Sequence, residues 1–472
     1  MNRIAVNILL ALFVSATSQA PLLAQAGDWR LGGTNPAAYV LDANGRATDP
    51  GGATISLRSA ADASGTFGSV SSRLSADALR GRRVTISAEL QTGGVSGGAS
   101  LWLRIDQGTT ALMLDNGSGE SVRGDTEWTV RSMSMLVPAE ASSVVFGVLL
   151  QGGSAVSVRR LRLEVSEPIA SSTPPSPAAK AVLDEALSIA KKNSLRRNET
   201  AWDVVEPKVR ALAAGAEKSA DVYPAIRYLL AQLGDHHSFL MPPSQSTQFR
   251  TGGAQNPIPE VRSLARGVGY ISMPGYSGAD ANAMRAYAKR MHDSLANTIG
   301  SASCGWVVDL RPNTGGNMWP MLAGLKPFLG GGGLGTFESP TGASPSWIAG
   351  QGVGVEPPSA LAALESTWVA VLTGPKTASS GEAVTIAFRG RPRTRSFGQP
   401  TAGLSTANGT FPLSDGAMIL LTTAIDADRT GQRYGDKVDP NVRVDATTGP
   451  DDTTLAIAVE WLRQSAGCDK GV

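Results

Sequence analysis

Two serines at the start of a predicted helix are the residues of this chain best suited to nucleophilic chemistry. The segment VAVLTGPKTASSGEAVTIAFRG (369–390) is typical of an apolar strand, a turn and a helix beginning near Ser380. Because amides at a helix N-terminus favour an anion, an oxyanion at an attacked carbonyl would be stabilised beside Ser379. Ser379 and Glu382 also fit an ordinary capping box, so this segment alone leaves both interpretations open.

A serine nucleophile needs a general base, and histidine is scarce here, with only three in the sequence. His236 and His237 follow Asp235 at the end of a predicted helix, in the turn DHHS. His292 lies within an amphipathic helix and is expected to pack there or face solvent. The adjacent pair therefore supplies the candidate base.

A glycine pair follows a second apolar strand, in VVDLRPNTGGNMWPM (307–321). Consecutive glycines leave backbone N–H groups unobstructed, which suits an oxyanion hole. Gly315 and Gly316 fit a simple tight turn equally well.

The common catalytic motifs are absent: the chain contains no GxxxxGK[ST] or HExxH, no GxSxG nucleophile elbow outside the turn cluster TGGVSGG, and no GxGxxG that opens a helix after a strand. Its one S-x-x-K, Ser188 to Lys191, lies in an amphipathic helix and indicates a surface. With three histidines and two cysteines, neither a multi-ligand zinc site nor an iron–sulfur cluster is expected. The sequence predicts no metal and no cofactor.

Composition limits the partners of the chain. Its 472 residues carry 42 Lys+Arg and 40 Asp+Glu, and this balance argues against a nucleic-acid partner. Hydrophobic residues make up 42% and charged residues 17%, so buried cores are expected and extensive disorder is not.

The first 26 residues predict a signal peptide. Arg3 precedes an apolar stretch at 4–16, and Ala24-Gln25-Ala26 forms a small-x-small cleavage site. No later segment has 18 consecutive apolar residues, so we expect an exported, periplasmic or extracellular protein without a membrane span. An oxidising compartment would allow a Cys304–Cys468 disulfide; the alternative is a small buried hydrophobe and an unpaired tail residue.

Hydrophobic periodicity predicts several domains after the signal peptide. Residues 27–166 alternate with period two between turn clusters, which favours an antiparallel, jelly-roll-like β-sandwich. It would bind a carbohydrate or protein ligand, or serve only as a spacer or cap; no residue favours one role. Four prolines mark a linker over 167–180.

Beyond the linker the period becomes helical. A small helical subdomain is expected over 181–243, with helices at 179–195 and 219–234. Strands and helices then alternate over 256–466, which predicts a mixed-sheet α/β core. Its expected elements are strands at 267–274, 305–311, 368–373, 394–399 and 417–428, and helices at 279–299, 317–328 and 380–389.

Taken in order, these segments resemble the tail-specific, or carboxy-terminal processing, serine peptidase family. The resemblance spans about 180–465 and rests on Gly269-Tyr270-Ile271, Asp309-Leu310-Arg311-Pro312-Asn313-Thr314-Gly315-Gly316, Thr377-Ala378-Ser379-Ser380-Gly381-Glu382 and Gly398-Gln399-Pro400-Thr401-Ala402-Gly403. The later DGAMILLTTA and YGDKVDPN segments look like the family's closing strand and its P-D motif, with Asn441 replacing the aspartate. The resemblance implies a ClpP/crotonase-like core and a serine endopeptidase that cleaves peptides or proteins without a cofactor.

The resemblance also assigns roles. Ser379 would be the nucleophile, and the amides of Ser380 and of Gly315 or Gly316 would form the oxyanion hole. Leu404 stands where the processing-protease branch carries its lysine base.

The interval between His237 and the strand at Gly267 is also too short for that branch's PDZ domain. Both departures point to the tricorn-like branch, in which the residue corresponding to His237 is the base. The family's late acidic residue has no clear counterpart, with Asp436 and Asp439 as candidates. The competing interpretation is a catalytically inactive, peptidase-like scaffold that binds through its sandwich.

Overall fold

The computed structural model describes residues 29–468 except 61–62, 64, 252–255 and 446–450. The predicted signal peptide lies outside these residues. The described chain forms two compact units, the first made of residues up to 175 with 211–217 and the second of 176–210 with 218 onward. No helix among the described residues is long and apolar enough to cross a membrane.

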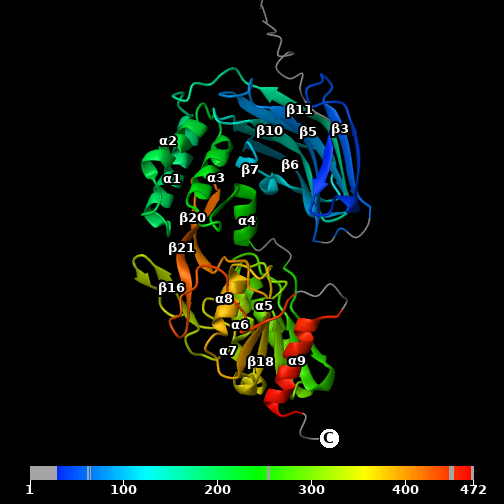
Figure 1. The fold of residues 1–472 in the computed structure, drawn as a ribbon, viewed down its shortest axis with the longest axis vertical. Helices are drawn as coiled ribbons and strands as arrows, with labels where there is room; N and C mark the ends of the chain where they lie inside the picture. The colour runs from blue at the N-terminus through cyan, green and yellow to red at the C-terminus, as the bar shows by residue number, and fades with distance from the viewer. Residues whose placement is uncertain (1–28, 61–62, 64, 252–255, 446–450, 469–472) are drawn as a thin grey trace, which may run out of the picture. The chain divides into compact units, whose positions relative to one another are not determined.

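The first unit is a sandwich of two antiparallel sheets, as the alternating sequence predicted (Figure 1). One sheet has the order β1-β4-β10-β6-β7, with β8 beside β6: Arg30–Gly33, Phe67–Ser75, Ser143–Gln151, Val95–Gln107, Thr110–Asp115 and Val122–Gly124. The other has the order β2-β3-β11-β5-β9: Tyr39–Asn44, Ala53–Ser59, Ala155–Val165, Arg83–Gly93 and Thr129–Leu136. Alternate residues of β5, such as Val84, Ile86 and Leu90, are fully buried, which gives this strand its core-facing side.

Helices begin the second unit. They are α1 (Pro177–Asn193), α2 (Trp202–Leu212), the short 3₁₀ helix η3 (Ser219–Val222), α3 (Tyr223–Gln232) and α4 (Pro243–Thr251). The last two residues of α2, 211 and 212, belong to the first unit. Helix α1 starts sharply because the Ser176 side chain accepts a hydrogen bond from Ala179 N and Pro177 occupies the first helical position. Helix α2, which contains Pro207, was not predicted from the sequence.

A mixed sheet forms the centre of the second unit, in the order β13-β14-β15-β18-β19-β22. Its strands are Glu260–Leu264, Val268–Ser272, Trp306–Asp309, Val369–Thr373, Thr394–Gly398 and Val442–Arg443. Strands β14 to β22 run parallel, and β13 is antiparallel to β14. The carboxyl ends of β15 and β18 therefore meet at one edge, where the Gly-Gly turn and the Ser379 segment follow.

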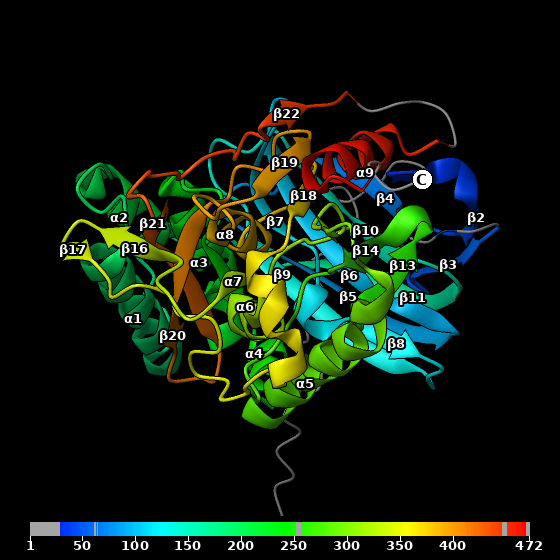
Figure 2. The ribbon, with the colours of Figure 1, turned by 90° about the horizontal axis from the view of Figure 1, so that it is seen from below.

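Helices cover both faces of this sheet, which is why β15 and β18 are buried along their whole length. Trp306 and Val308 pack into the core on the side of α5 (Ala281–Thr298), α6 (Met318–Gly324), α7 (Lys326–Leu329) and α8 (Ser380–Ala387). Val307 faces the other side, where Ala458 and Leu462 of α9 (Thr453–Ala466) cover it. Figure 2 shows α9 beside β18 and β19.

A second, antiparallel sheet completes this unit, in the order β12-β21-β16-β17 with β20 along β21. Its strands are Phe239–Met241, Met418–Asp428, Gly335–Ser339, Gly342–Ala343 and Thr406–Pro412. Because β12 starts two residues after His237, its pairing with β21 fixes that histidine in space.

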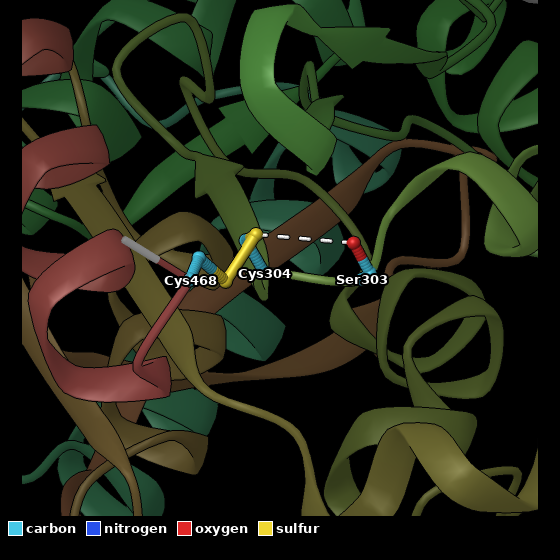
Figure 3. The surroundings of a disulfide bond; sticks show 3 residues. All are labelled: Ser303, Cys304 and Cys468. Carbon is cyan, nitrogen blue, oxygen red and sulfur yellow. Dashed lines mark hydrogen bonds between the residues drawn. A yellow bond between two sulfur atoms is a disulfide. The ribbon is translucent and has the colours of Figure 1, made fainter. Parts of the chain in front are cut away.

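A disulfide joins Cys304 and Cys468, whose Cα atoms are 5.8 Å apart (Figure 3). Of the two alternatives left open by the sequence, the structure therefore has the bonded pair. It links the chain after α9 to the residues just before β15, across a sequence separation of 164.

Candidate active site

The imidazole of His237 and the hydroxyl of Ser379 are in hydrogen-bond contact. His237 Nε2 lies 2.8 Å from Ser379 Oγ, although 142 residues separate the two in sequence. The histidine precedes β12 of the antiparallel sheet, and the serine precedes α8 at the edge of the mixed sheet. A nucleophile and a base at this distance can transfer a proton directly.

Ser379 occupies a strained turn between β18 and α8. Its φ of 53° and ψ of −120° are unusual for a residue other than glycine. Such strain persists where surrounding contacts impose it, and it often marks functional sites. The turn directs Oγ towards His237 while the first amides of α8 lie alongside.

The carboxyl group of Glu382 holds this turn in place. Glu382 is fully buried, and its Oε2 accepts hydrogen bonds from the amides of Ser379 and Leu404, both at 2.8 Å. Its Oε1 accepts from the Thr401 hydroxyl at 2.5 Å and the Gly403 amide at 3.0 Å. Burial raises the pKa of Glu382, while these hydrogen bonds favour the ionised form. The predicted capping-box glutamate thus ties the nucleophile to the 401–404 segment.

The turn carrying His237 is held by Asp235. Asp235 Oδ1 accepts from the amides of His237 at 2.9 Å and Ser238 at 2.8 Å, and its Oδ2 accepts from the Ser238 hydroxyl at 2.6 Å. The Asn408 side chain donates to the His237 carbonyl at 2.9 Å. These contacts fix the backbone from which the imidazole projects.

The electrostatics of His237 suit a base. Burial lowers its pKa, and the nearby charge of Asp235 opposes that shift. A lowered pKa keeps the imidazole neutral near pH 7, as proton abstraction requires. Its second nitrogen, Nδ1, lies 2.6 Å from the hydroxyl oxygen of Thr406 on β20.

The other two histidines differ in environment. His236 is exposed and lines the same cavity, with a φ of 55° in the turn. His292 is buried in α5, and its Nε2 lies 3.0 Å from the Ala323 carbonyl, so it is a packing residue.

The glycine turn approaches the nucleophile closely. A Cβ atom on Gly315 would lie 2.8 Å from Ser379 Cβ, so only glycine fits there. The Gly315 amide donates to the Asn313 side chain at 3.0 Å and is therefore occupied. In the described part of the chain, the amides of Gly316 and Ser380 have no hydrogen-bond acceptor.

The Ser380 hydroxyl donates to the Gly316 carbonyl at 2.6 Å and so joins the two segments that carry these free amides. The sequence left open whether Gly315 or Gly316 supplies the second amide of the oxyanion hole. Of the two, Gly316 has the available N–H group. An oxyanion hole needs such unpaired donors beside the nucleophile.

A cavity of about 890 Å³ opens at this pair and is lined by both His237 and Ser379. Its walls come from α6, α8, β12, β16, β20 and β21 and are largely apolar, with Trp319, Phe337 and Leu420 among them. The cavity has room for a segment of a polypeptide.

Comparison with known proteins places part of the chain in a family. Residues 267–444 match the model of peptidase family S41. This part of the chain belongs to peptidase family S41. The match supports a peptidase, a hydrolase that acts on proteins or peptides.

Two relatives of this S41 peptidase match at 25% identity. The nisin-resistance protein of Lactococcus lactis subsp. lactis aligns over 268 residues, 56% of this chain and 80% of the relative. The structure of a lipoprotein from Streptococcus agalactiae superposes with a TM-score of 0.54, covering 61% of this chain and 97% of that one. A photosystem II D1 C-terminal processing protease matches at 17% identity and a TM-score of 0.43, over 61% of this chain and 98% of that one.

The two aspartates suggested as a third member of the S41 site make other contacts. Asp436 Oδ1 accepts from the neighbouring Lys437 amide at 2.8 Å, and the Asp439 carbonyl accepts from the Arg389 side chain. The position beside His237 Nδ1 is occupied by Thr406, which was not predicted from the sequence.

No group of three His, Cys, Asp or Glu side chains among the described residues could hold a metal ion.

Proposed function

We propose that this chain is an exported serine-type endopeptidase with Ser379 as nucleophile and His237 as general base. The observation that carries the proposal is the 2.8 Å contact between His237 Nε2 and Ser379 Oγ. It is supported by a strained turn, by free amides beside the serine and by an adjoining cavity.

In the first half of the reaction, His237 Nε2 takes the proton of Ser379 as Oγ attacks the substrate's carbonyl carbon. The carbonyl oxygen becomes an oxyanion, which accepts hydrogen bonds from the amides of Ser380 and Gly316. The resulting imidazolium then donates its proton to the leaving amine, and an acyl-enzyme remains on Ser379.

In the second half, water enters the site and His237 removes its proton. Attack on the acyl carbon forms a second oxyanion in the same place, and its collapse releases the new carboxyl terminus. The proton returns to Ser379 Oγ, so the enzyme is regenerated without a metal or cofactor.

Thr406 would take the place that an acidic residue has in many serine peptidases. When its hydroxyl oxygen accepts a hydrogen bond from Nδ1–H, the lone pair of Nε2 faces Ser379. A neutral acceptor fixes the tautomer of His237 but gives the imidazolium less stabilisation than a carboxylate would.

We also propose export and a modular chain. The N-terminal signal pattern and the Cys304–Cys468 disulfide both fit an oxidising compartment. The nisin-resistance protein and the lipoprotein among the relatives support the same inference. In this proposal, a signal peptide (1–26), an accessory sandwich (27–166) and a linker (167–180) precede the helical subdomain (181–243) and the peptidase core (256–466). The last four residues of the predicted linker, 177–180, form the first turn of α1 in the structure.

Hydrolysis of an unstructured protein such as casein, followed by mass spectrometry of the products, tests the assignment. Wild type should cleave and Ser379→Ala should be inactive. Ser380→Ala should lose much less activity, because the reaction uses the amide of Ser380, while its hydroxyl only supports the turn through the hydrogen bond to Gly316. Equal losses in the two variants would place the nucleophile elsewhere. An inactive wild type would favour the scaffold interpretation.

A further inference from the structure

The cavity beside the nucleophile carries one formally charged side chain. Among the described residues that line it, Asp426 is the only Asp, Glu, Lys or Arg. Most of the surrounding surface is apolar, including Met318, Trp319, Phe337, Ala383, Leu420 and Ala424. A substrate side chain in this cavity therefore meets hydrocarbon walls and a single carboxyl group.

Asp426 is buried without a partner. It lies on β21 opposite Phe337 of β16 and is 1% exposed. Neither of its carboxyl oxygens has a hydrogen-bond partner within the described chain. Burial, and to a lesser extent the charge of Glu382, raises the pKa of Asp426 to about 8. An unpaired buried carboxyl group is costly, so its presence calls for a functional reason.

A second buried carboxyl group lies near the first. Glu382 is close enough for its charge to act on Asp426, and all four of its hydrogen-bond donors are neutral: the Thr401 hydroxyl and the amides of Ser379, Gly403 and Leu404. Buried acids are normally paired with a cation. Neither acid has a cationic partner in the described chain, so this region of the cavity is suited to receive a positive charge from outside.

The position of Asp426 indicates which substrate residue would supply that charge. Ala383 lies one helical turn after Ser379 and lines the cavity, and the preceding residue, Glu382, is the one that interacts with Asp426. Asp426 is therefore on the side of the cavity next to the first turn of α8. This side of the cavity adjoins the nucleophile, so we take it as the position for the side chain of the residue whose carbonyl is attacked.

We infer that Asp426 forms the floor of the pocket for that residue and selects lysine or arginine there. This inference rests on the proposed function. The aliphatic part of the substrate side chain packs against Phe337 and Ala424, and its ammonium or guanidinium group pairs with the Asp426 carboxylate. The cation supplies the partner that the buried carboxyl group of Asp426 lacks in the free enzyme.

The test uses three fluorogenic peptides that differ only in the residue before the scissile bond: arginine, leucine or glutamate. Wild type should cleave the arginine peptide with the highest kcat/KM. Asp426→Asn should lower that value by about 30-fold or more, as expected for loss of a buried charge pair, and leave the leucine peptide nearly unchanged. Asparagine is similar in size to the neutral acid, so the variant is expected to fold; its thermal midpoint verifies this.

A matched control removes a negative charge outside the cavity. Glu338 follows Phe337 on β16, and adjacent residues of a strand point to opposite faces. Its carboxylate accepts a hydrogen bond from Thr336, and it does not line the cavity. Glu338→Gln should leave the ratio of arginine to leucine cleavage as in wild type. An equal fall in that ratio would attribute the preference to the general field instead of Asp426.

The rate of fluorophosphonate labelling separates this inference from the proposed function, because labelling needs Ser379 and His237 but no basic side chain. If wild type is labelled but does not prefer arginine or lysine, the inference is wrong and the proposed function stands. If wild type is neither labelled nor active, both fail. The wild-type comparison decides the inference even if Asp426→Asn does not fold, and Asp426→Ser provides a second variant.

Discussion

Replacing Thr406 by valine removes the hydroxyl group that contacts His237 and keeps the shape of the side chain. The contact is short, 2.6 Å between Thr406 Oγ1 and His237 Nδ1, and both residues are half-buried. In the variant, Nδ1–H loses its acceptor, and the tautomer that carries its proton on Nε2, which cannot act as a base, becomes more populated.

The size of the effect follows from the cost of a buried donor without an acceptor, about 1–3 kcal/mol. If that cost falls on the reactive tautomer, kcat/KM should decrease by about 5- to 150-fold. The loss should appear mainly in kcat, because Thr406 acts on the imidazole and not on bound peptide. The free energy of unfolding should change by less than about 1.5 kcal/mol, the usual worth of one hydrogen bond.

The assay compares kcat and KM of Thr406→Val with those of Thr298→Val, a control whose hydroxyl donates to the Ser294 carbonyl of its own helix. Asp436→Asn and Asp439→Asn, tested in parallel, should remain close to wild type. Wild-type activity in Thr406→Val together with a large loss in either aspartate variant would refute the assignment of Thr406.

Three further predictions concern the base, the glycine turn and the disulfide. Because burial lowers the pKa of His237, kcat/KM measured as a function of pH should rise through a midpoint below about 6.5, the ordinary pKa of histidine. A midpoint above about 7 would contradict this prediction. Gly315→Ala should reduce kcat/KM by at least about 100-fold, since its Cβ would lie 2.8 Å from Ser379 Cβ; unchanged kinetics would show that the turn moves freely. Cys304→Ser should lower the free energy of unfolding in urea by about 2–5 kcal/mol, and Cys468→Ser should match it; no change in midpoint would mean the bond contributes little.

The sequence was informative where a local pattern carries the geometry. Alternation of apolar and polar residues predicted the strands of the sandwich, and continuous apolar segments predicted β15 and β18 of the mixed sheet. The turn before α8 and the DHHS turn are also local features, so Ser379 and His237 could be named before their 2.8 Å contact was known.

Features set by long-range pairing were beyond the sequence. Thr406 lies at the start of β20, in TANGTFP, which lacks apolar alternation, and its contact with His237 depends on strands paired in three dimensions. The Cys304–Cys468 bond likewise depends on where α9 packs. No sequence pattern around Asp426 distinguishes it from other aspartates, because its burial, its missing partners and its place in the cavity wall depend on the folded structure.

Two details had local signals that could have been used. The pattern Asn313-x-Gly315 is typical of an Asx turn, in which the asparagine side chain accepts from the amide two residues later, so Gly316 could have been preferred. Helix α9, which was not predicted from the sequence, also has local signals. Asp452 is its N-cap and Gly467 its C-cap, and Ala458 and Leu462 between them are apolar.

The most direct test of the central claim is the site of covalent modification by a fluorophosphonate, located by peptide mass spectrometry. The account predicts a single stoichiometric adduct on Ser379 in wild type, none in Ser379→Ala, and labelling of His237→Ala slowed by at least about 100-fold, the lower end of what a general base contributes. An adduct on Ser380, or full-rate labelling without His237, would contradict the account.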